Sequence, residues 1–409
     1  MTPRVRPVRE DELPAYLDAM SAAFLDRPAV AAIAGDVKDL WNFQRAWAAF
    51  DGERICGTFR SWETELTVPG GGRLPTSAVT NVAVLPTHRP RGVLRAMIAA
   101  EHAAIRERGE AVGVLYAAEY PIYGRFGYGP GCQIATWTLD AHGAAFAAKP
   151  AGSVEVVTPI ASARDPMNAL FETWRLRQPG EIRCTPYRWD FDLGLREQHW
   201  GTPWKGFVAF HRDASGEVDG FARYTGEQKW ERGLPRSVIS VNDFVALTED
   251  AYDGLWQFLG TMDLVATVKA EQRIPTERLP WLLVNARAAT VSELVDGVWV
   301  RLFDVPRALA ARTYERSADL VLEVVDAEAP GGRTRLQLDA GPDGSTCRKT
   351  RRSPDLTLDL AALSAAYLGG TRLRDAVLAN RVDEHRAGAL ARADALFATL
   401  EPPRCSTFF

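Results

Sequence analysis

The sequence is sparing with the residues that hold metal ions or disulfide frameworks. Its five cysteines, Cys56, Cys132, Cys184, Cys347 and Cys405, are scattered, odd in number, and form no CxxC pair or Cys/His cluster. The six histidines are dispersed as well. A structural zinc site and a disulfide-stapled fold are therefore not expected, and we predict no metal cofactor. Cysteines in this pattern are typical of a protein of the reducing cytoplasm.

Long apolar runs and a strong excess of charge are also missing. No uninterrupted apolar stretch approaches the roughly 20 residues of a membrane-spanning helix, and the opening MTPRVRPVREDELPAYLDAM does not have the pattern of a secretory leader. A net charge of -4 over 409 residues gives no general attraction to nucleic acid or to anionic membranes. We therefore expect neither partner, and any phosphate-binding patch has to be local.

What is present is a chain too long for one hydrophobic core, with strand and helix patterns alternating over residues 1–140. The buried runs TSAVTNVAV and AVGVLY flank the helical VLRAMIAAEHAAIRERG, for which Gly109 is the predicted C-cap. The alternating QIATWTLD is expected to be the last strand of this first unit. A segment of linker composition follows at 141–153.

A second region, 154–295, partly repeats the first. Its SVISVNDFVALTEDAY resembles TSAVTNVAVLPTHRPRG in the strand, in an asparagine (Asn242 against Asn81) and in the following threonine. The second copy lacks the basic, glycine-containing loop. We interpret the region as a duplicated fold without a phosphate site, the alternative being coincidence of a common strand–helix pattern.

A third region, 296–409, begins with the strand VWVRLF. Asp304 is then a plausible helix N-cap, with Pro306 near the start of that helix. Three further strands, LSAAYLGG and an alanine-rich helix follow, and the chain finishes with STFF.

The best phosphate-binding candidate is THRPRGVLRAM. It offers a preceding strand, the charges of Arg89 and Arg91, Gly92 for close approach, and a helix directly behind the loop. The spacing Arg89-x-x-Gly92 is half of the R/Q-x-x-G-x-G/A signature of GCN5-related N-acetyltransferases, with Leu94 in place of the last small residue. Taken alone, the motif is equally a basic loop that caps a helix. The preceding strand NVAV suits an exposed edge that pairs with a peptide-like ligand arm.

YPIYGRFGYGPG, residues 120–131, is not expected to be a nucleotide loop despite its glycines. No helix follows it, and Pro130 with the alternating segment behind it predicts a turn into a strand. Phe126 and Tyr128 are expected to pack on the core. Tyr123 is therefore the one tyrosine of this segment left as a candidate for chemistry. Its neighbours Pro121 and Gly124 fit a splayed strand that exposes its phenol.

Together, VAVLPTHRPRGVLRAM, AAEYPIYGRFGYGP and the aromatic end STFF resemble the Eis (enhanced intracellular survival) family of bacterial acetyltransferases, over the whole chain in domain order. The resemblance implies a mixed α/β (α+β) architecture: a GCN5-related N-acetyltransferase domain (1–140), a degenerate acetyltransferase-like domain (154–295) and a domain like sterol carrier protein 2 (296–409). It further implies acetyl-CoA as cosubstrate and a homo-hexamer of two trimers. The implied acceptors are amines of aminoglycosides, at more than one position, or lysine side chains.

The family's acetyl-CoA contacts carry over to two strand ends and the basic loop. They fall on Val82, Ala83, Val84, Arg89, Pro90, Arg91, Gly92, Val93, Leu94, Arg95, Ala118 and Glu119. Ala118 stands where a family member can carry serine, and Pro90 interrupts an arginine run. Both positions are therefore expected to act through their backbone.

The resemblance assigns the proton transfers to Tyr123 and to the carboxy-terminus. A tyrosine, with an ordinary pKa near 10, is protonated at neutral pH and can donate to a departing thiolate. The α-carboxylate of Phe409, with an ordinary pKa of about 3.5, is ionised and can accept the proton of the attacking amine. Phe408 and Phe409 are expected to anchor the end of the chain in apolar surroundings.

A polycationic amine would favour an acidic pocket, for which Asp26 and Glu119 are the candidates. Phe408 stands where a family member can have an acidic residue, which predicts a less acidic pocket here. Two alternatives stay open at this point. One is a protein-lysine or small-metabolite N-acetyltransferase; the other is a non-enzymatic lipid- or ligand-carrying scaffold, against which THRPRG and Tyr123 argue.

Overall fold

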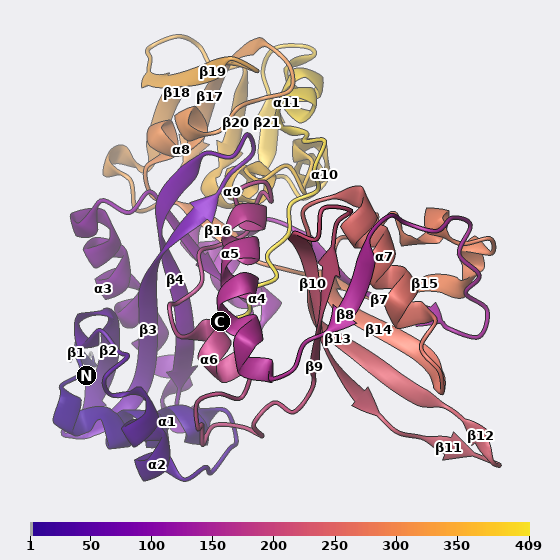
Figure 1. The fold of residues 1–409 in the computed structure, drawn as a ribbon. Helices are drawn as coiled ribbons and strands as arrows, with labels where there is room; N and C mark the ends of the chain where they lie inside the picture. The colour runs from indigo at the N-terminus through magenta and orange to yellow at the C-terminus, as the bar shows by residue number, and fades with distance from the viewer. Residues whose placement is uncertain (1–2) are drawn as a thin grey trace.

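The computed structural model describes residues 3–409, apart from the side chain of Pro90. Three units, each with its own large β-sheet, surround the carboxy-terminus (Figure 1). In that view the first unit lies at the left, the second at the right and the third at the top, with the end of the chain between them. The predicted mixed α/β class is confirmed by this alternation of strands and helices.

The first unit contains a seven-stranded sheet with the order β1-β2-β3-β4-β5-β16-β6. Its strands are β1 (Arg4–Pro7), β2 (Ala46–Asp51), β3 (Arg54–Thr67), β4 (Arg73–Val84), β5 (Val112–Leu115), β16 (Trp299–Leu302) and β6 (Gly129–Pro130). Its helices are α1 (Leu13–Ala23), α2 (Val30–Val37), α3 (Val93–Arg108) and the single turn α4 (Tyr120–Tyr123). α1 packs against β3 and β4, whereas α3 packs against β2, β3 and β4.

Helix α3 has the predicted boundaries because glycine occupies both ends. Gly92 precedes it with φ 74°, and Gly109 ends it with φ 68°, a left-handed conformation that glycine adopts without steric cost. Between them Val93, Met97 and Ile105 are buried in the core. The apolar face therefore fixes the helix against the sheet, and its amino-terminal turn stays open.

Strand β5 pairs with β4 along its whole length, but β4 continues beyond the end of β5. Their parallel pairing extends from Thr76 opposite Val112 to Val79 opposite Leu115. Strand β4 continues to Val84, so the peptide groups of residues 80–84 have no strand partner on that side within residues 3–409. The exposed strand edge predicted for NVAV is therefore present, and the two strands diverge around a gap.

The second unit contains a seven-stranded sheet with the order β15-β7-β14-β13-β10-β9-β8. Its strands are β15 (Ala289–Asp296), β7 (Gln133–Asp140), β14 (Val265–Arg273), β13 (Ser237–Ala246), β10 (Val218–Glu227), β9 (Phe207–Arg212) and β8 (Ser153–Val156). The helices are α5 (Arg164–Arg175), α6 (Arg188–Asp192) and α7 (Glu249–Gly260), and a small hairpin joins β11 (Trp230–Glu231) to β12 (Leu234–Pro235).

The two seven-stranded sheets exchange strands. β7, expected to finish the first sheet, pairs instead with β14 and β15 of the second. β16, expected to open the third region, lies between β5 and β6 of the first sheet. Both assignments were wrong because an alternating pattern identifies a strand but not its neighbour. The domain boundaries at residues 140 and 295 stay predictions.

The duplication inferred from Asn81 and Asn242 has a structural counterpart. The register of β4 against β3 slips around Asn81, and that of β13 against β10 slips at Asn242. In the second unit, however, Trp204 Nε1 donates to Asn242 Oδ1 at 3.0 Å. The helix that follows, α7, is capped by its own Thr248. A shared bulge with a self-capped helix favours a duplicated fold that has no anion-binding loop.

The third unit contains a five-stranded sheet with the order β19-β18-β17-β20-β21. Its elements are α8 (Val305–Ala311), β17 (Ala318–Val325), β18 (Arg333–Gly341), β19 (Gly344–Lys349), β20 (Leu356–Asp359), α9 (Leu360–Ala366), α10 (Leu373–Val377), β21 (Val382–Glu384) and α11 (Ala389–Phe397). Asp304 caps α8 as predicted, its carboxylate accepting from the N–H of Arg307 at 3.1 Å. Within residues 3–409, we find no helix with the length and apolar character needed to cross a membrane.

Candidate active site

A cavity of about 600 Å³ lies at the gap between β4 and β5. We call it the first cavity; its lining includes nine of the residues predicted to contact acetyl-CoA, namely Val82, Ala83, Val84, Arg89, Gly92, Leu94, Arg95, Ala118 and Glu119. Tyr123 and Phe126 also line it. The strand edge, the basic loop and the start of α3 are thus brought together on one cavity.

The loop before α3 fits a pyrophosphate. Gly92 leaves open space where a side chain would stand, since no atom lies within 4 Å of a Cβ built there. No side chain caps the first turn of α3, so its N–H groups remain available to an anion. Arg89 and Arg95 are exposed, and neither makes an ion pair with residues 3–409. A phosphate can therefore reach both backbone donors and positive charge.

Two of the described contact residues, Arg91 and Val93, do not line the first cavity. Arg91 turns toward Asp51, with 3.4 Å between Nη1 and Oδ2. The side chain of Val93 is buried in the core, so only its backbone is available at the helix start. The side chain of Pro90 lies outside the described part of the structure. The roles of these residues stay predictions.

Tyr123 is not mounted on a strand, as its neighbours suggested, but on the one-turn helix α4. Glu119 precedes the helix, Pro121 lies in its first turn, and a 3-10 turn, Gly124–Phe126, continues from it. Proline preorganises such a start because its φ angle is already helical. The predicted turn into a strand does occur, but only at β6. Tyr128 is buried and Phe126 partly buried, as expected.

The ring of Tyr123 is 6% exposed and packs edge-on against Tyr128, with 6.1 Å between ring centroids. Burial raises the pKa of Tyr123 to about 12, and the charge of Glu119 acts in the same direction. The phenol is therefore protonated throughout the neutral and moderately alkaline range. It also lines two cavities at once, the first cavity and a larger one described next.

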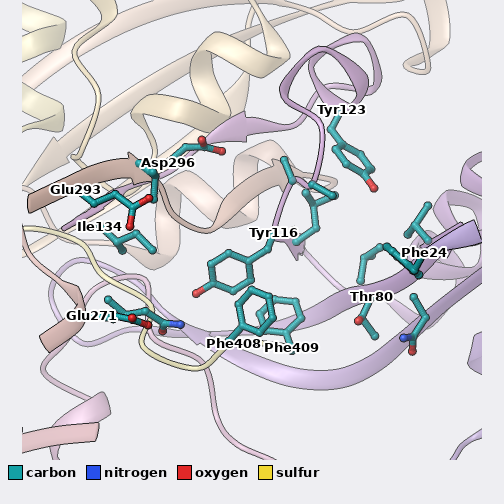
Figure 2. A pocket seen from close by; sticks show the side chains of 18 of the residues that line it. Phe24, Thr80, Tyr116, Tyr123, Ile134, Glu271, Glu293, Asp296, Phe408 and Phe409 are labelled. Carbon is teal, nitrogen blue, oxygen red and sulfur yellow. The ribbon is translucent and has the colours of Figure 1, made fainter. Parts of the chain in front are cut away.

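The larger cavity, of about 970 Å³, lies between the first two units and is strongly acidic. We call it the acidic cavity; its charged side chains are Glu271, Glu293 and Asp296, and no lysine, arginine or histidine is among the described residues that line it. Figure 2 shows these acids on one side, Tyr123 on the other, and Phe408 and Phe409 beside Tyr116 between them. The predicted loss of acidity at Phe408 is therefore offset by strands of the second unit.

Backbone irregularity helps to aim one of these acids. The pairing of β14 with β7 slips between Ala270 and Arg273, and Gln272 has a positive φ of 52°. A bulge redirects the side chains of its strand, which brings Glu271 to the cavity wall. Glu271 makes no side-chain hydrogen bond or ion pair that we find in residues 3–409. Its carboxylate is free to meet a cation.

The carboxy-terminus is held by polar contacts and by Phe409, whereas Phe408, expected to anchor it as well, is 71% exposed. Glu181, fully buried, accepts from Ser406 N and from Ser406 Oγ, both at 2.7 Å, and from Thr407 N at 3.3 Å. Tyr116 donates its hydroxyl to the carbonyl of Cys405 at 3.0 Å. The ring of Phe409 stands edge-on to Trp62 at 5.8 Å. The end of the chain is thereby fixed beside the acidic cavity, and the sequence analysis had missed Glu181 altogether.

We expect Glu181→Ala to release the last residues. Hydrogen bonds to a charged acceptor contribute about 1.5–3 kcal/mol each, and this change removes three of them from one tail. Activity should fall at least tenfold, and carboxypeptidase should shorten the variant faster than the wild type, as followed by intact mass. Glu401→Ala, an exposed acid on the same segment, is the matched control. A tail equally protected in both variants would contradict this assignment.

Asp26 is exposed, accepts from the N–H of Arg27 at 2.7 Å and lines neither cavity, although Phe24 just before it lines both. Its role in substrate binding stays a prediction. No group of three histidine, cysteine, aspartate or glutamate side chains within residues 3–409 is placed to hold a metal ion.

Comparison with known proteins agrees with this geometry. A family model described as an acetyltransferase (GNAT) domain matches residues 4–131, a second acetyltransferase (GNAT) domain matches 180–302, and a sterol carrier protein domain matches 305–406. The fold and the matches define a GCN5-related N-acetyltransferase with a degenerate second copy and a sterol-carrier-like third domain.

The chain belongs to the Eis family of N-acetyltransferases. It is 34% identical to the N-acetyltransferase Eis of Mycobacterium tuberculosis over 86% of this chain and 85% of that protein. An uncharacterised N-acetyltransferase of Streptomyces avermitilis is 38% identical over 99% of this chain and 98% of its own length. The crystal structure of Eis1 from Mycobacterium abscessus superposes with a TM-score of 0.87 at 34% identity, covering 99% of this chain and 100% of that one. The predicted family and architecture are confirmed.

Proposed function

We propose that this enzyme transfers the acetyl group of acetyl-CoA to primary amines of polyamine substrates such as aminoglycosides, at more than one position. The observation that carries the proposal is that Tyr123 lines both the first cavity and the acidic cavity. A donor lying along β4 would meet an amine from the other side at this residue. When bound, acetyl-CoA supplies the thioester whose carbonyl the amine attacks.

The residues of the chain account for the two proton transfers. The Tyr123 hydroxyl, whose pKa is raised to about 12, donates a proton to the departing sulfur. The terminal carboxylate of Phe409, on the wall of the acidic cavity, accepts the proton that the amine loses. Arg89, Arg95 and the first turn of α3 bind the pyrophosphate, and the free edge of β4 orients the pantetheine arm.

The acidic wall supports a cationic acceptor. Glu271, Glu293 and Asp296 lie on strands of the second unit and face a cavity without basic side chains among its described lining residues. A cavity lined by one sign of charge concentrates the opposite charge and accelerates its entry. A polyamine that can enter in several orientations would present different amines to Tyr123, which is why acetylation at more than one position is proposed.

A thiol-release assay with acetyl-CoA and tobramycin or kanamycin tests the function. We expect turnover with the wild type, and Glu271→Gln with Glu293→Gln should raise KM about tenfold for the polyamine while changing KM for a monoamine little. The double variant Glu227→Gln with Glu231→Gln is the control, because both acids are exposed on β10 and β11 and neither lines the acidic cavity. An unchanged KM in the cavity double variant would remove the acidic wall from substrate binding.

The homo-hexamer implied by the resemblance and the cytoplasmic location predicted from the cysteine pattern remain part of the proposal. Light scattering coupled to size exclusion, and cell fractionation, would check them.

A further inference from the structure

A third cavity, of about 680 Å³, is lined by residues of the carboxy-terminus but not by Tyr123. We call it the Arg60 cavity; it shares Thr80, Asn81, Trp200, Glu271, Gln272, Phe408 and Phe409 with the acidic cavity. One of its walls is apolar and comes from α1, α2 and the segment after α2, through Leu17, Met20, Ile33, Val37, Leu40 and Trp41. Because the two cavities share lining residues, one molecule can extend from one into the other past the terminal residues.

Two of the three arginines on this cavity are already committed to carboxylates. Arg188 donates to Asp243 at 2.6 Å and to Asp192 at 3.0 Å. Arg223 donates to the other oxygen of Asp243 at 2.5 Å and to the carbonyl of Asp192 at 2.7 Å. The buried Asp243 is thus saturated by two guanidinium groups. Neither arginine has a free pair of guanidinium N–H groups that could bind a ligand carboxylate.

Arg60 is different. It lies on β3, its guanidinium stacks on the ring of Trp41 at 4.4 Å, and we find no ion pair from it to any carboxylate of residues 3–409. Its Nε is buried and has no acceptor. Burial lowers the pKa of Arg60 from its ordinary value, opposed by Tyr187 and Tyr16. Arg60 is partly buried and has a buried, unpartnered Nε, and an anion from outside the chain would compensate its charge.

We propose that the enzyme also acetylates amines that carry a carboxylate, which Arg60 binds in the Arg60 cavity while the amine lies in the acidic cavity. The inference rests on the proposed N-acetyltransferase function and adds to its polyamine substrates a class of amines with an acid group on an apolar body. The guanidinium offers planar, charge-assisted hydrogen bonds that match a carboxylate. The apolar wall from α1 and α2 accepts the part of the molecule between the two charged ends.

The charges of the two cavities set the orientation. Glu293 and Asp296 line only the acidic cavity, where they attract the amine and repel a carboxylate, whereas Glu271 lines both cavities. A purely cationic polyamine gains nothing from Arg60 and is confined to the acidic cavity. Phe409 lines the Arg60 cavity too, yet we find no ion pair between its terminal carboxylate and Arg60 within residues 3–409. The carboxylate of the substrate would therefore supply the charged partner that Arg60 lacks.

The test compares amines that differ only in this group. Initial rates of thiol release are measured for aminohexanoate, aminooctanoate and their carboxamides. The wild type should have a kcat/KM about 10- to 100-fold higher for the preferred acid than for its amide, the range expected of a charged hydrogen bond. Arg60→Met should bring this ratio to about one, and Arg60→Lys should retain part of it because the charge remains without the fork. Arg54→Met, at the exposed start of the same strand, should keep the wild-type ratio.

The remaining outcomes either refute carboxylate binding by Arg60 or show whether the acetyltransferase function has failed instead. A wild-type ratio of one, or an equal loss on acid and amide in Arg60→Met, would refute carboxylate recognition. If no amine is acetylated, the proposed function fails, and calorimetric binding of aminooctanoate decides the inference alone. Binding that is lost in Arg60→Met but kept in Arg54→Met would still support it; equal binding in both would overturn it. Thermal melting of each variant checks that the fold is intact.

Discussion

Tyr123→Phe is expected to lower kcat by about 100- to 1000-fold, within the roughly 100- to 10,000-fold contribution of a positioned general acid. The substitution removes only the hydroxyl, so the packing of the ring against Tyr128 is kept and KM for acetyl-CoA should change little. Tyr120→Phe is the matched control, since Tyr120 starts the same short helix but is 61% exposed. Activity in Tyr123→Phe equal to that of Tyr120→Phe would remove Tyr123 from the mechanism.

The pH profile gives an independent check on the same residue. Because the pKa of Tyr123 is raised to about 12, its proton is present at lower pH and is lost only as the pH rises through that value. The wild-type rate should therefore show no decline between pH 8 and pH 10 that the phenylalanine variant lacks. An alkaline limb near pH 10 that disappears in Tyr123→Phe would mean that the phenol titrates at its ordinary pKa.

Deleting Phe409 should have the second large effect, a loss of about 100-fold in kcat. The deletion moves the terminal carboxylate back by one residue, roughly 3.5 Å along the chain, and removes the ring that contacts Trp62 and Tyr116. A base displaced this far no longer reaches the same proton, whereas the tail remains held through Ser406 and Thr407. Single-turnover rates at saturating amine would measure the loss.

Two companion variants separate the carboxylate from the ring. Phe409→Ala keeps the chain end in register and loses only aromatic packing, so a smaller loss is expected. Adding one glycine after Phe409 keeps the ring and displaces the carboxylate, so it should resemble the deletion. Full activity in the deletion, or equal effects in all three variants, would exclude the terminal carboxylate as the base.

Elements with local signals were predictable. Helix α3 is bounded by two glycines with positive φ, and Asp304 caps α8 through a contact three residues away. Such features depend on neighbours in the sequence, which is why pattern and spacing identify them. The loop at Arg89 and Gly92 belongs to the same group, and it does line the first cavity.

The remaining features depend on residues brought together from distant segments. The acidic wall combines Glu271 of β14 with Glu293 of β15, two strands that lie on either side of β7 in the second sheet and reach the cavity lined by Tyr123 only through the packing of the two units. Glu181 meets Ser406 across more than half of the chain. Isolated acids in a sequence are usually solvated surface residues, so neither feature carried a local signal. The short helix that holds Tyr123 was hidden by its glycines, which favoured a turn.

The strand exchange has a consequence for how the enzyme comes to exist. The first sheet remains open between β5 and β6 until β16, residues 299–302, is available to fill the space. During synthesis the amino-terminal domain therefore cannot complete its sheet when its own residues have left the ribosome, but has to wait for most of the second domain. Pairings this distant in sequence make folding slow and expose unpaired edges meanwhile. An excised amino-terminal domain should for the same reason lack one strand of its sheet. Recombination that separates the domains would therefore leave the first sheet without β16.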